Sequence, residues 1–247
     1  MLWEFGVFLL TAANLAALWL VYDYPSKVFW ILGIFALIAL IGTRVIAKHL
    51  RLFLLLMLLA LGAVLLLPLI DSPAQAKAFM VLASGIFYLV ALAGYRLRKY
   101  AKDQTAKAMI NLASLAVLFC WYASVFGWFL NIEISVWYVM AVLAVVTFLV
   151  SYVSIVSNGL GLNYHQNILY SVFLAYLISG TVWIQSTWPF GYLTTGVIAL
   201  IIYYAGWDTV RNYFQGKLVS RKVAFNLIFL AGSVSVLLLS TKWYPIV

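Results

Sequence analysis

One acidic side chain in this sequence has an obvious cationic partner. Asp208 stands three residues before Arg211, so a helix places the two side chains on one face, within reach of an ion pair. At the inner end of a membrane helix, this carboxylate could gate a pathway or bind a lipid head group. The structural alternative is an interfacial ion pair that ends the helix. Both interpretations predict an inner-mouth ion pair between Asp208 and Arg211.

A polar stripe follows two neighbouring apolar segments. At about 100° per residue, four polar residues of the segment 166–186 fall within about 40° of one line on a helix. The preceding segment carries a matching stripe at its inner end, and the loop 157–165 between them has no Lys or Arg. The stripes predict either a solute cavity or close helix packing through small and hydroxyl side chains. The cavity candidates are Ser151, Ser154, Asn158, Asn167, Ser171, Thr181 and Gln185.

Tryptophan gathers at the outer ends of the apolar segments. Membrane proteins usually place Trp and Tyr at both interfaces, so a bias toward one side is informative. It could mark an aromatic platform for a lipid-linked or glycan group. The alternative is an anchoring belt in one leaflet, with cations anchoring the other. The platform candidates are Trp128, Trp137, Trp183 and Trp188.

Residue types that enzymes and metal centres need are sparse. The chain has six acids, two histidines and one cysteine, and no H-E-x-x-H, G-x-S-x-G or P-loop motif. His49 and His165 are far apart in the sequence. No acid lies in the middle of an apolar segment, which argues against a proton relay through a membrane. We therefore expect no metal and no cofactor, and we favour a non-enzymatic role over an intramembrane enzyme.

Four asparagines lie within apolar segments or at their edges. An amide in hydrocarbon needs a hydrogen-bond partner, which is commonly found on a neighbouring helix. We expect these amides to fix helix packing, with a substrate site as the alternative, and Asn167 could instead cap its own helix. The residues are Asn14, Asn111, Asn167 and Asn226.

The composition sets the class of element that must hold all of these side chains. The chain is 67% hydrophobic and 9% charged, whereas soluble domains are about 45–50% apolar and about 25% charged. This excludes soluble enzymes, nucleic-acid readers and disordered chains. A helix of about 20 apolar residues crosses a membrane, and we count nine such runs, roughly 3–22, 28–47, 52–70, 77–95, 107–129, 134–156, 166–186, 190–210 and 223–240.

The predicted fold is therefore an all-α polytopic bundle of about nine transmembrane helices. We expect residues 1–247 to form a single integral membrane domain, because little sequence is left for an extramembrane one. The first run has Glu4 in place of a basic leader and no clear small-residue cleavage site, so we expect a retained helix and not a signal peptide.

The charge pattern predicts the orientation. Of the 15 Lys and Arg, three lie in residues 44–51, five in 96–107 and four in 211–222. Nine spans put these three loops on one side, and basic loops stay cytoplasmic, which places the N-terminus inside and the C-terminus outside. The net charge of +9 thus indicates anionic lipid head groups at the cytoplasmic face as partners, at about 1 kcal/mol per cation, and no nucleic acid.

The last third of the chain resembles small uncharacterised multi-pass membrane proteins of bacteria. The residues that carry the resemblance are Trp188-Pro189-Phe190-Gly191, Trp207 and Lys242-Trp243. It implies a location in the bacterial cytoplasmic membrane and no particular activity.

Two function classes follow from these patterns. The first is a non-enzymatic carrier of a lipid-like or neutral small solute, which the polar stripes and the missing catalytic motifs favour. The second is a membrane-embedded assembly subunit, or homo-oligomer, whose aromatic outer ends contact another membrane protein or a lipid-linked envelope precursor.

Overall fold

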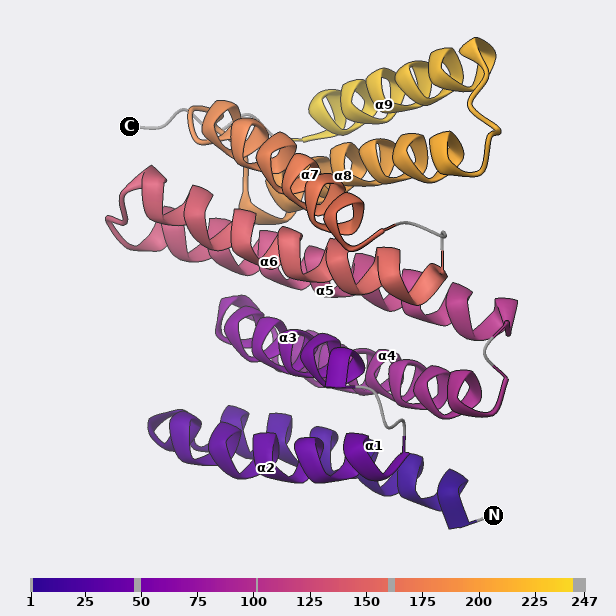
Figure 1. The fold of residues 1–247 in the computed structure, drawn as a ribbon. Coiled ribbons are helices and arrows are strands. Elements are labelled where there is room, and N and C mark those ends of the chain that lie inside the picture. The colour runs from indigo at the N-terminus through magenta and orange to yellow at the C-terminus, as the bar shows by residue number, and fades with distance from the viewer. Residues whose placement is uncertain (1, 47–49, 101, 160–162, 242–247) are drawn as a thin grey trace. The chain divides into compact units, whose positions relative to one another are not determined.

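The described residues of the computed structural model are almost entirely helical. They are residues 2–46, 50–100, 102–159 and 163–241, with 89% helix and no strand among them. These residues form nine α-helices (Figure 1) and two short 3-10 helices, η1 and η2. Their bounds are α1 Leu2–Asp23, η1 Pro25–Lys27, α2 Val28–Ile46, α3 Leu50–Leu66, η2 Leu67–Leu69, α4 Pro73–Lys99, α5 Gln104–Asn131, α6 Val136–Asn158, α7 Tyr164–Gln185, α8 Tyr192–Phe214 and α9 Ser220–Ser240.

Within this described part, all nine α-helices are long and apolar enough to cross a membrane. The predicted all-α class, with nine helices long and apolar enough to span a membrane, is thereby confirmed. The helices α4 and α5 run past the predicted ends, with 27 and 28 residues. At a rise of about 1.5 Å per residue such helices exceed about 30 Å of hydrocarbon. An apolar run in the sequence identifies only the part of a helix that fits in hydrocarbon. The polar or charged ends of the helix are therefore not predicted from it.

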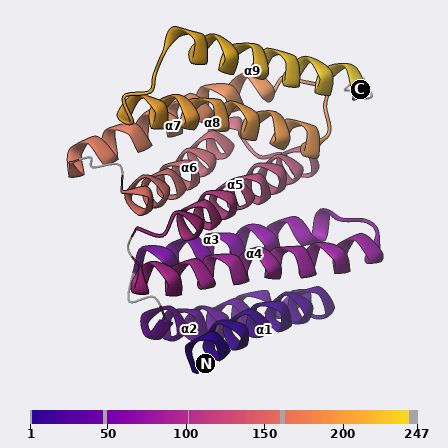
Figure 2. The ribbon, with the colours of Figure 1, turned by 90° about the vertical axis from the view of Figure 1, so that its right-hand side faces the viewer.

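The chain divides into two compact units, residues 1–120 and 121–247. In the first unit, α1 packs against α2 and α4, and α3 packs against α2 and α4. Leu18, Ala63 and Met80 belong to its core, and the rings of Phe35 and Phe87 lie 5.7 Å apart. In the second unit, α6 packs along α7, α7 along α8, and α8 along α9. Figure 2 shows α9 lying along α8 at the edge of this unit.

A close helix crossing fixes α8 against the second half of α5. A Cβ atom added at Gly196 of α8 would lie 2.9 Å from the backbone nitrogen of Ala123. Only a residue without a Cβ allows this approach. The crossing holds α8, and with it the residues near its other end, in a defined position within the second unit.

Asp103 caps α5 in the first unit. Its Oδ1 accepts hydrogen bonds from the N–H groups of Thr105 at 2.9 Å and Ala106 at 3.3 Å, and Arg96 Nε donates to Oδ2 at 2.7 Å. Desolvation raises the pKa of the Asp103 carboxyl, but the bonds from Ala106, Arg96 and Thr105 outweigh it and hold the pKa below its usual value of 3.8. The cap joins the last turn of α4 to the first turn of α5.

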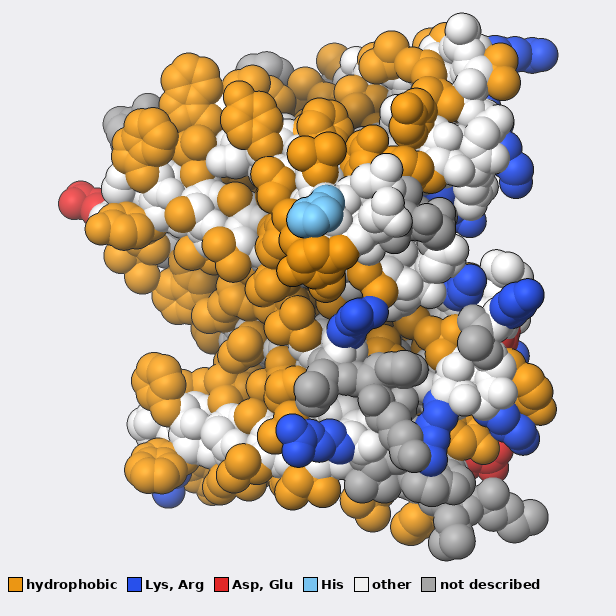
Figure 3. Space-filling view, viewed as in Figure 1, with side chains coloured by type: hydrophobic (Ala, Val, Ile, Leu, Met, Phe, Trp, Pro, Cys, Tyr) orange, Lys and Arg blue, Asp and Glu red, His pale blue; other side chains and the backbone are white. Residues whose placement is uncertain are grey.

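Cationic side chains gather at particular helix ends. Figure 3 shows Lys and Arg side chains concentrated at one end of the second unit, with an acidic side chain at its opposite end. Helix ends with basic residues include α4, with Arg96, Arg98 and Lys99, and α8, with Arg211. The predicted N-inside orientation rests on this charge pattern and stays a prediction.

Candidate functional site

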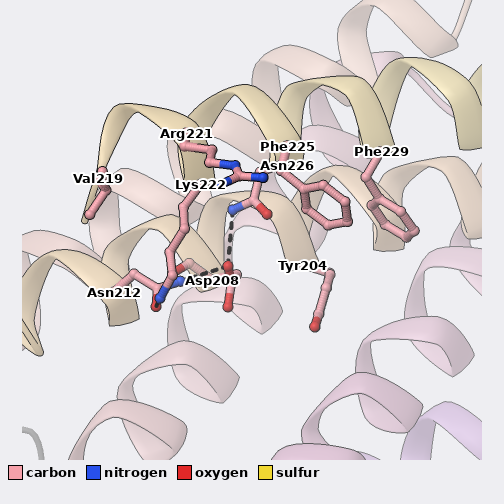
Figure 4. Close-up of a pocket in the computed structure, with 9 residues that line it drawn as sticks. All are labelled: Tyr204, Asp208, Asn212, Val219, Arg221, Lys222, Phe225, Asn226 and Phe229. Atoms are coloured by element: carbon pink, nitrogen blue, oxygen red, sulfur yellow. Dashed lines mark hydrogen bonds between the residues drawn. The ribbon is translucent and has the colours of Figure 1, made fainter. Parts of the chain in front are cut away.

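A groove lies between α8 and α9 in the second unit. Its cavity volume is about 740 Å³. Figure 4 shows side chains from both helices and from the end of their connecting segment around it. They are Tyr204, Asp208, Asn212, Val219, Arg221, Lys222, Phe225, Asn226 and Phe229.

The polar end of the groove is organised around the carboxylate of Asp208. Its Oδ2 accepts hydrogen bonds from Asn212 Nδ2 at 2.7 Å and from Asn226 Nδ2 at 2.9 Å. The Asn212 amide also donates to the main-chain oxygen of Asp208 at 2.8 Å, as a residue one turn later on a helix can. Because Asn226 comes from α9, this cluster bridges the two helices.

The cations of the groove lie at the start of α9. Lys222 Nζ donates to Asn212 Oδ1 at 3.4 Å, and Arg221 lines the same hollow (Figure 4). Both residues fall in the first turn of α9, where the positive end of the helix dipole disfavours cations. An anion in the groove would relieve this repulsion.

The far end of the groove is apolar. Phe225 and Phe229 of α9 face the hollow opposite Tyr204 of α8 (Figure 4). Phe229 also borders a second hollow of about 520 Å³ that continues along the same helix pair. Its other lining residues are Val197, Ile201, Ile228, Gly232, Ser233, Val236 and Leu237. The helix pair therefore offers a charged compartment followed by an apolar one.

The helix α9 forms its side of the groove without burying any residue. Polar contacts hold it to α8 near both ends: Asn226 bonds to Asp208, and the hydroxyls of Thr194 and Thr241 lie 3.5 Å apart. Between these contacts Ile228 is 71% exposed and Val236 is 65% exposed. The α9 side of the apolar stretch is therefore exposed.

The two residues of the predicted inner-mouth pair lie in different surroundings. Within the described residues, the carboxylate of Asp208 bonds to the amides of Asn212 and Asn226, while Arg211 is exposed and does not pair with it. The physical reason is that the amide at the fourth position reaches back along the helix, and the second amide arrives from α9. Asp208 itself lines the hollow between α8 and α9.

The polar stripes of α6 and α7 lie largely within helix packing. Ser151, Ser154, Ser171 and Gln185 are buried, and Asn158, Asn167 and Thr181 are half-buried. Three of their donors bond back to main-chain oxygens one turn earlier: Asn158 to Ser154, Ser171 to Asn167, and Thr181 to Leu177. These bonds satisfy the polar groups locally, so the stripes on their own do not require a solute. The loop residues 160–162 lie outside the described residues.

Gln185 differs from the rest of the stripe. It is 2% exposed, and neither its Oε1 nor its Nε2 has a hydrogen-bond partner among the described residues. Its predicted role in a cavity stays a prediction.

Ser151 belongs to a buried hydroxyl cluster whose other three members the sequence reasoning missed. Tyr122 of α5 and Thr147 of α6 share a hydrogen bond of 2.8 Å, and Ser151 Oγ donates to Tyr203 of α8 at 3.2 Å. All four side chains are almost fully buried. The spacing of Thr147 and Ser151, one turn apart, was the available signal on α6. Their aromatic partners come from other helices and leave no such pattern.

Two of the asparagines, Asn14 and Asn167, have different roles. Asn14 Nδ2 donates to Ser84 Oγ at 3.2 Å between α1 and α4, so it joins helices as expected. Asn167 does not cap α7: the N-cap is Asn163, in a capping box with Gln166.

The predicted platform tryptophans differ in exposure. Trp137 and Trp183 are 71% and 58% exposed, and Trp188 stacks edge-on against Phe190. Trp128 is half-buried.

The sequence pattern that could have predicted the groove is the spacing of Tyr204, Asp208 and Asn212. These residues recur every four positions and therefore share one face of α8. The partners from α9 could not be paired with this face without knowing that α8 and α9 pack together.

No group of three or more His, Cys, Asp or Glu side chains that could hold a metal lies in the described part of the chain, and His49 is outside it. No protein-family model, curated protein or solved structure matches the sequence. The groove is therefore the candidate functional site.

Proposed function

We propose that this multi-pass membrane protein binds and carries a lipid-like solute in the α8–α9 groove. Its proposed location is the bacterial cytoplasmic membrane, with the N-terminus on the cytoplasmic side. One observation carries the proposal: the same helix pair lines a charged hollow of about 740 Å³ and an adjoining apolar hollow of about 520 Å³. A lipid has the same two-part chemistry, a polar head followed by an apolar chain. Pockets of about 300–1,000 Å³ are typical of small-molecule sites.

In a membrane, the two parts of the groove differ in how well they can discriminate between lipids. An acyl chain gains little hydrophobic free energy by moving from bilayer to protein, because lipid tails are as apolar as the side chains. The apolar hollow therefore supplies shape for a chain, and the charged hollow supplies selectivity. This division agrees with a lipid-like solute better than with a small polar one.

A glycine in the groove allows a sharp test. Gly232 lines the apolar hollow, and a Cβ there meets nothing within 4 Å, so Gly232→Leu should fill the hollow without disturbing the helix. The matched control is Gly180→Leu on α7, which also has open space around it and does not line the groove. We expect native mass spectrometry of gently extracted protein to detect bound lipid in the wild type and in Gly180→Leu, and to detect much less in Gly232→Leu.

Lipid transport is tested separately in reconstituted vesicles. Wild type and Gly180→Leu should speed the movement of a fluorescent phospholipid between leaflets, and Gly232→Leu should not. Equal lipid binding by all three proteins would remove the groove as the site. Binding without movement in any of them would remove the carrier function.

The exposure of α9 favours a second candidate, an assembly subunit with a membrane-protein partner or a second copy of the chain. Phe225 is 67% exposed and Leu239 is 85% exposed on this helix. A stoichiometric protein retained in the same mass spectra, and lost when Leu239 is changed to a bulky Trp, would support this candidate over the carrier.

A further inference from the structure

We infer that the groove selects an aminophospholipid, a lipid whose head group joins a phosphodiester to a primary ammonium, as in phosphatidylethanolamine. The inference rests on the proposed lipid binding and adds the chemistry of the head group. It follows from the charges of both signs that α8 and α9 bring to one hollow.

The carboxylate of Asp208 is the ammonium side of the site. Both amides donate to its Oδ2, and in the described part of the chain its Oδ1 accepts no hydrogen bond. The Oδ1 of Asn226 is likewise an acceptor without a donor there. Two acceptors, one of them charged, suit an ammonium that carries N–H donors.

The cations of α9 are the phosphate side. Arg221 and Lys222 line the hollow that contains Asp208 (Figure 4), yet in the described chain neither forms an ion pair with it. Each therefore keeps a charge that a phosphodiester can share. The phosphate would also offset the unfavourable position of these cations at the start of a helix.

The two halves together discriminate among common lipids. Phosphatidylglycerol offers the phosphate but no ammonium, so it leaves the charge of Asp208 uncompensated. Phosphatidylcholine has a positive charge but no N–H, so it cannot donate to Asp208 Oδ1. Diacylglycerol has neither group and would leave Arg221 and Lys222 unneutralised.

The first experiment compares lipids on the unmodified full-length protein. Delipidated protein in detergent is titrated with phosphatidylethanolamine, phosphatidylcholine, phosphatidylglycerol and diacylglycerol of identical acyl chains, and bound lipid is counted by native mass spectrometry. Loss of one charge-assisted hydrogen bond weakens binding by about tenfold or more, so phosphatidylethanolamine should bind at least about tenfold more tightly than the others. Equal affinities for these lipids would overturn the inference and leave the groove as a general lipid site.

Variants assign the two halves of the head group. Asp208→Asn should abolish the preference for phosphatidylethanolamine over phosphatidylglycerol, while the control Glu133→Gln, an exposed acid at the other end of the unit, should keep it. The double change Arg221→Gln with Lys222→Gln should weaken all three phospholipids, whereas Arg211→Gln with Lys217→Gln, two exposed cations outside the hollow, should not. A preference that survives Asp208→Asn would contradict the assignment.

Failure of the proposed function looks different from failure of this inference. If no lipid binds the wild type, lipid binding itself is wrong. If lipids bind without a head-group preference, only the inference is wrong. Because the lipid comparison uses the unmodified chain, neither conclusion depends on whether a variant folds.

Discussion

Among single residues, Asp208 has surroundings that packing alone does not explain. A buried or half-buried carboxylate is usually paired with a cation, because its desolvation is otherwise costly. Arg211 stands at a suitable spacing, yet two amides take its place and contact only one of the carboxylate oxygens. Amides hold the group in position without neutralising it. The remaining negative charge is available to a ligand in the groove.

Asp103 represents the opposite arrangement, a carboxylate whose partners all belong to the protein. Its lowered pKa means that the ionised form stabilises the folded state. The contribution is complete above the ordinary Asp pKa of 3.8 and is lost as the pH falls through the lower pKa of the folded state. We expect Asp103→Ala to lower the melting temperature at neutral pH, with the difference from wild type shrinking as the pH falls below that range.

Two further variants separate the parts of this effect. Asp103→Asn keeps an N-cap acceptor and loses only the charge, so it should melt between wild type and Asp103→Ala. Asp71→Asn, at an exposed acid, should leave the melting temperature unchanged at every pH. A difference that persists undiminished at low pH would argue against the ionised cap.

The sequence identified Asp208 but not its surroundings, for a physical reason. Spacing along one helix reveals neighbours at the third and fourth positions, and Arg211 and Asn212 both qualify. Which of them contacts the carboxylate depends on what approaches from outside. Asn226 is 18 residues away and reaches Asp208 only because α9 packs on α8.

The helices themselves were predictable, since each apolar run is long enough to span hydrocarbon and has few alternatives there. Their neighbours were not predictable. In a membrane, lipid-facing and protein-facing sides are both apolar, so the pattern that identifies a buried face in soluble proteins is weak. The helix α9 illustrates this: it is as apolar as the others, yet none of its residues is buried.

The contact between α5 and α8 gives a test at the level of elements. A Cβ at Gly196 would meet the backbone of Ala123 at 2.9 Å, and backbone cannot move aside as a flexible side chain can. We expect Gly196→Ala to destabilise the protein by about 1–3 kcal/mol, the usual cost of overpacking. The measurement is reversible unfolding in mixed micelles.

The control for this contact is Gly180→Ala. Nothing lies within 4 Å of a Cβ at that position, so this change should stabilise by up to about 1 kcal/mol through helix propensity. If both substitutions stabilise the protein equally, the close crossing of α5 and α8 is absent.

For the whole molecule, the charge pattern predicts which ends of the helices face the cytoplasm. Cys120 is the one cysteine of the sequence, and it is buried, so the native chain should resist labelling. Single cysteines introduced at exposed positions can then report which side of the membrane each position faces. Thr187→Cys lies between α7 and α8, and Gln215→Cys lies between α8 and α9, both at exposed positions.

A membrane-impermeant maleimide should label Thr187→Cys in intact cells, and Gln215→Cys only after the cells are permeabilised. The reason is that the segment with Gln215 lies beside Arg211, Lys217 and Arg221, and basic loops stay cytoplasmic. Labelling of both positions in intact cells, or the reverse pattern, would overturn the N-inside orientation.

The groove between α8 and α9 has one more consequence, because exposed helix surface borders its apolar stretch. A ligand that enters from the side of a membrane helix is never diluted in water. The abundance of the proposed lipid is a fraction of the surrounding leaflet, so expanding the membrane at fixed composition should leave the occupancy of the groove unchanged. Replacing one head group by another should change the occupancy at once. The proposed site would then respond to the composition of the leaflet and not to its quantity.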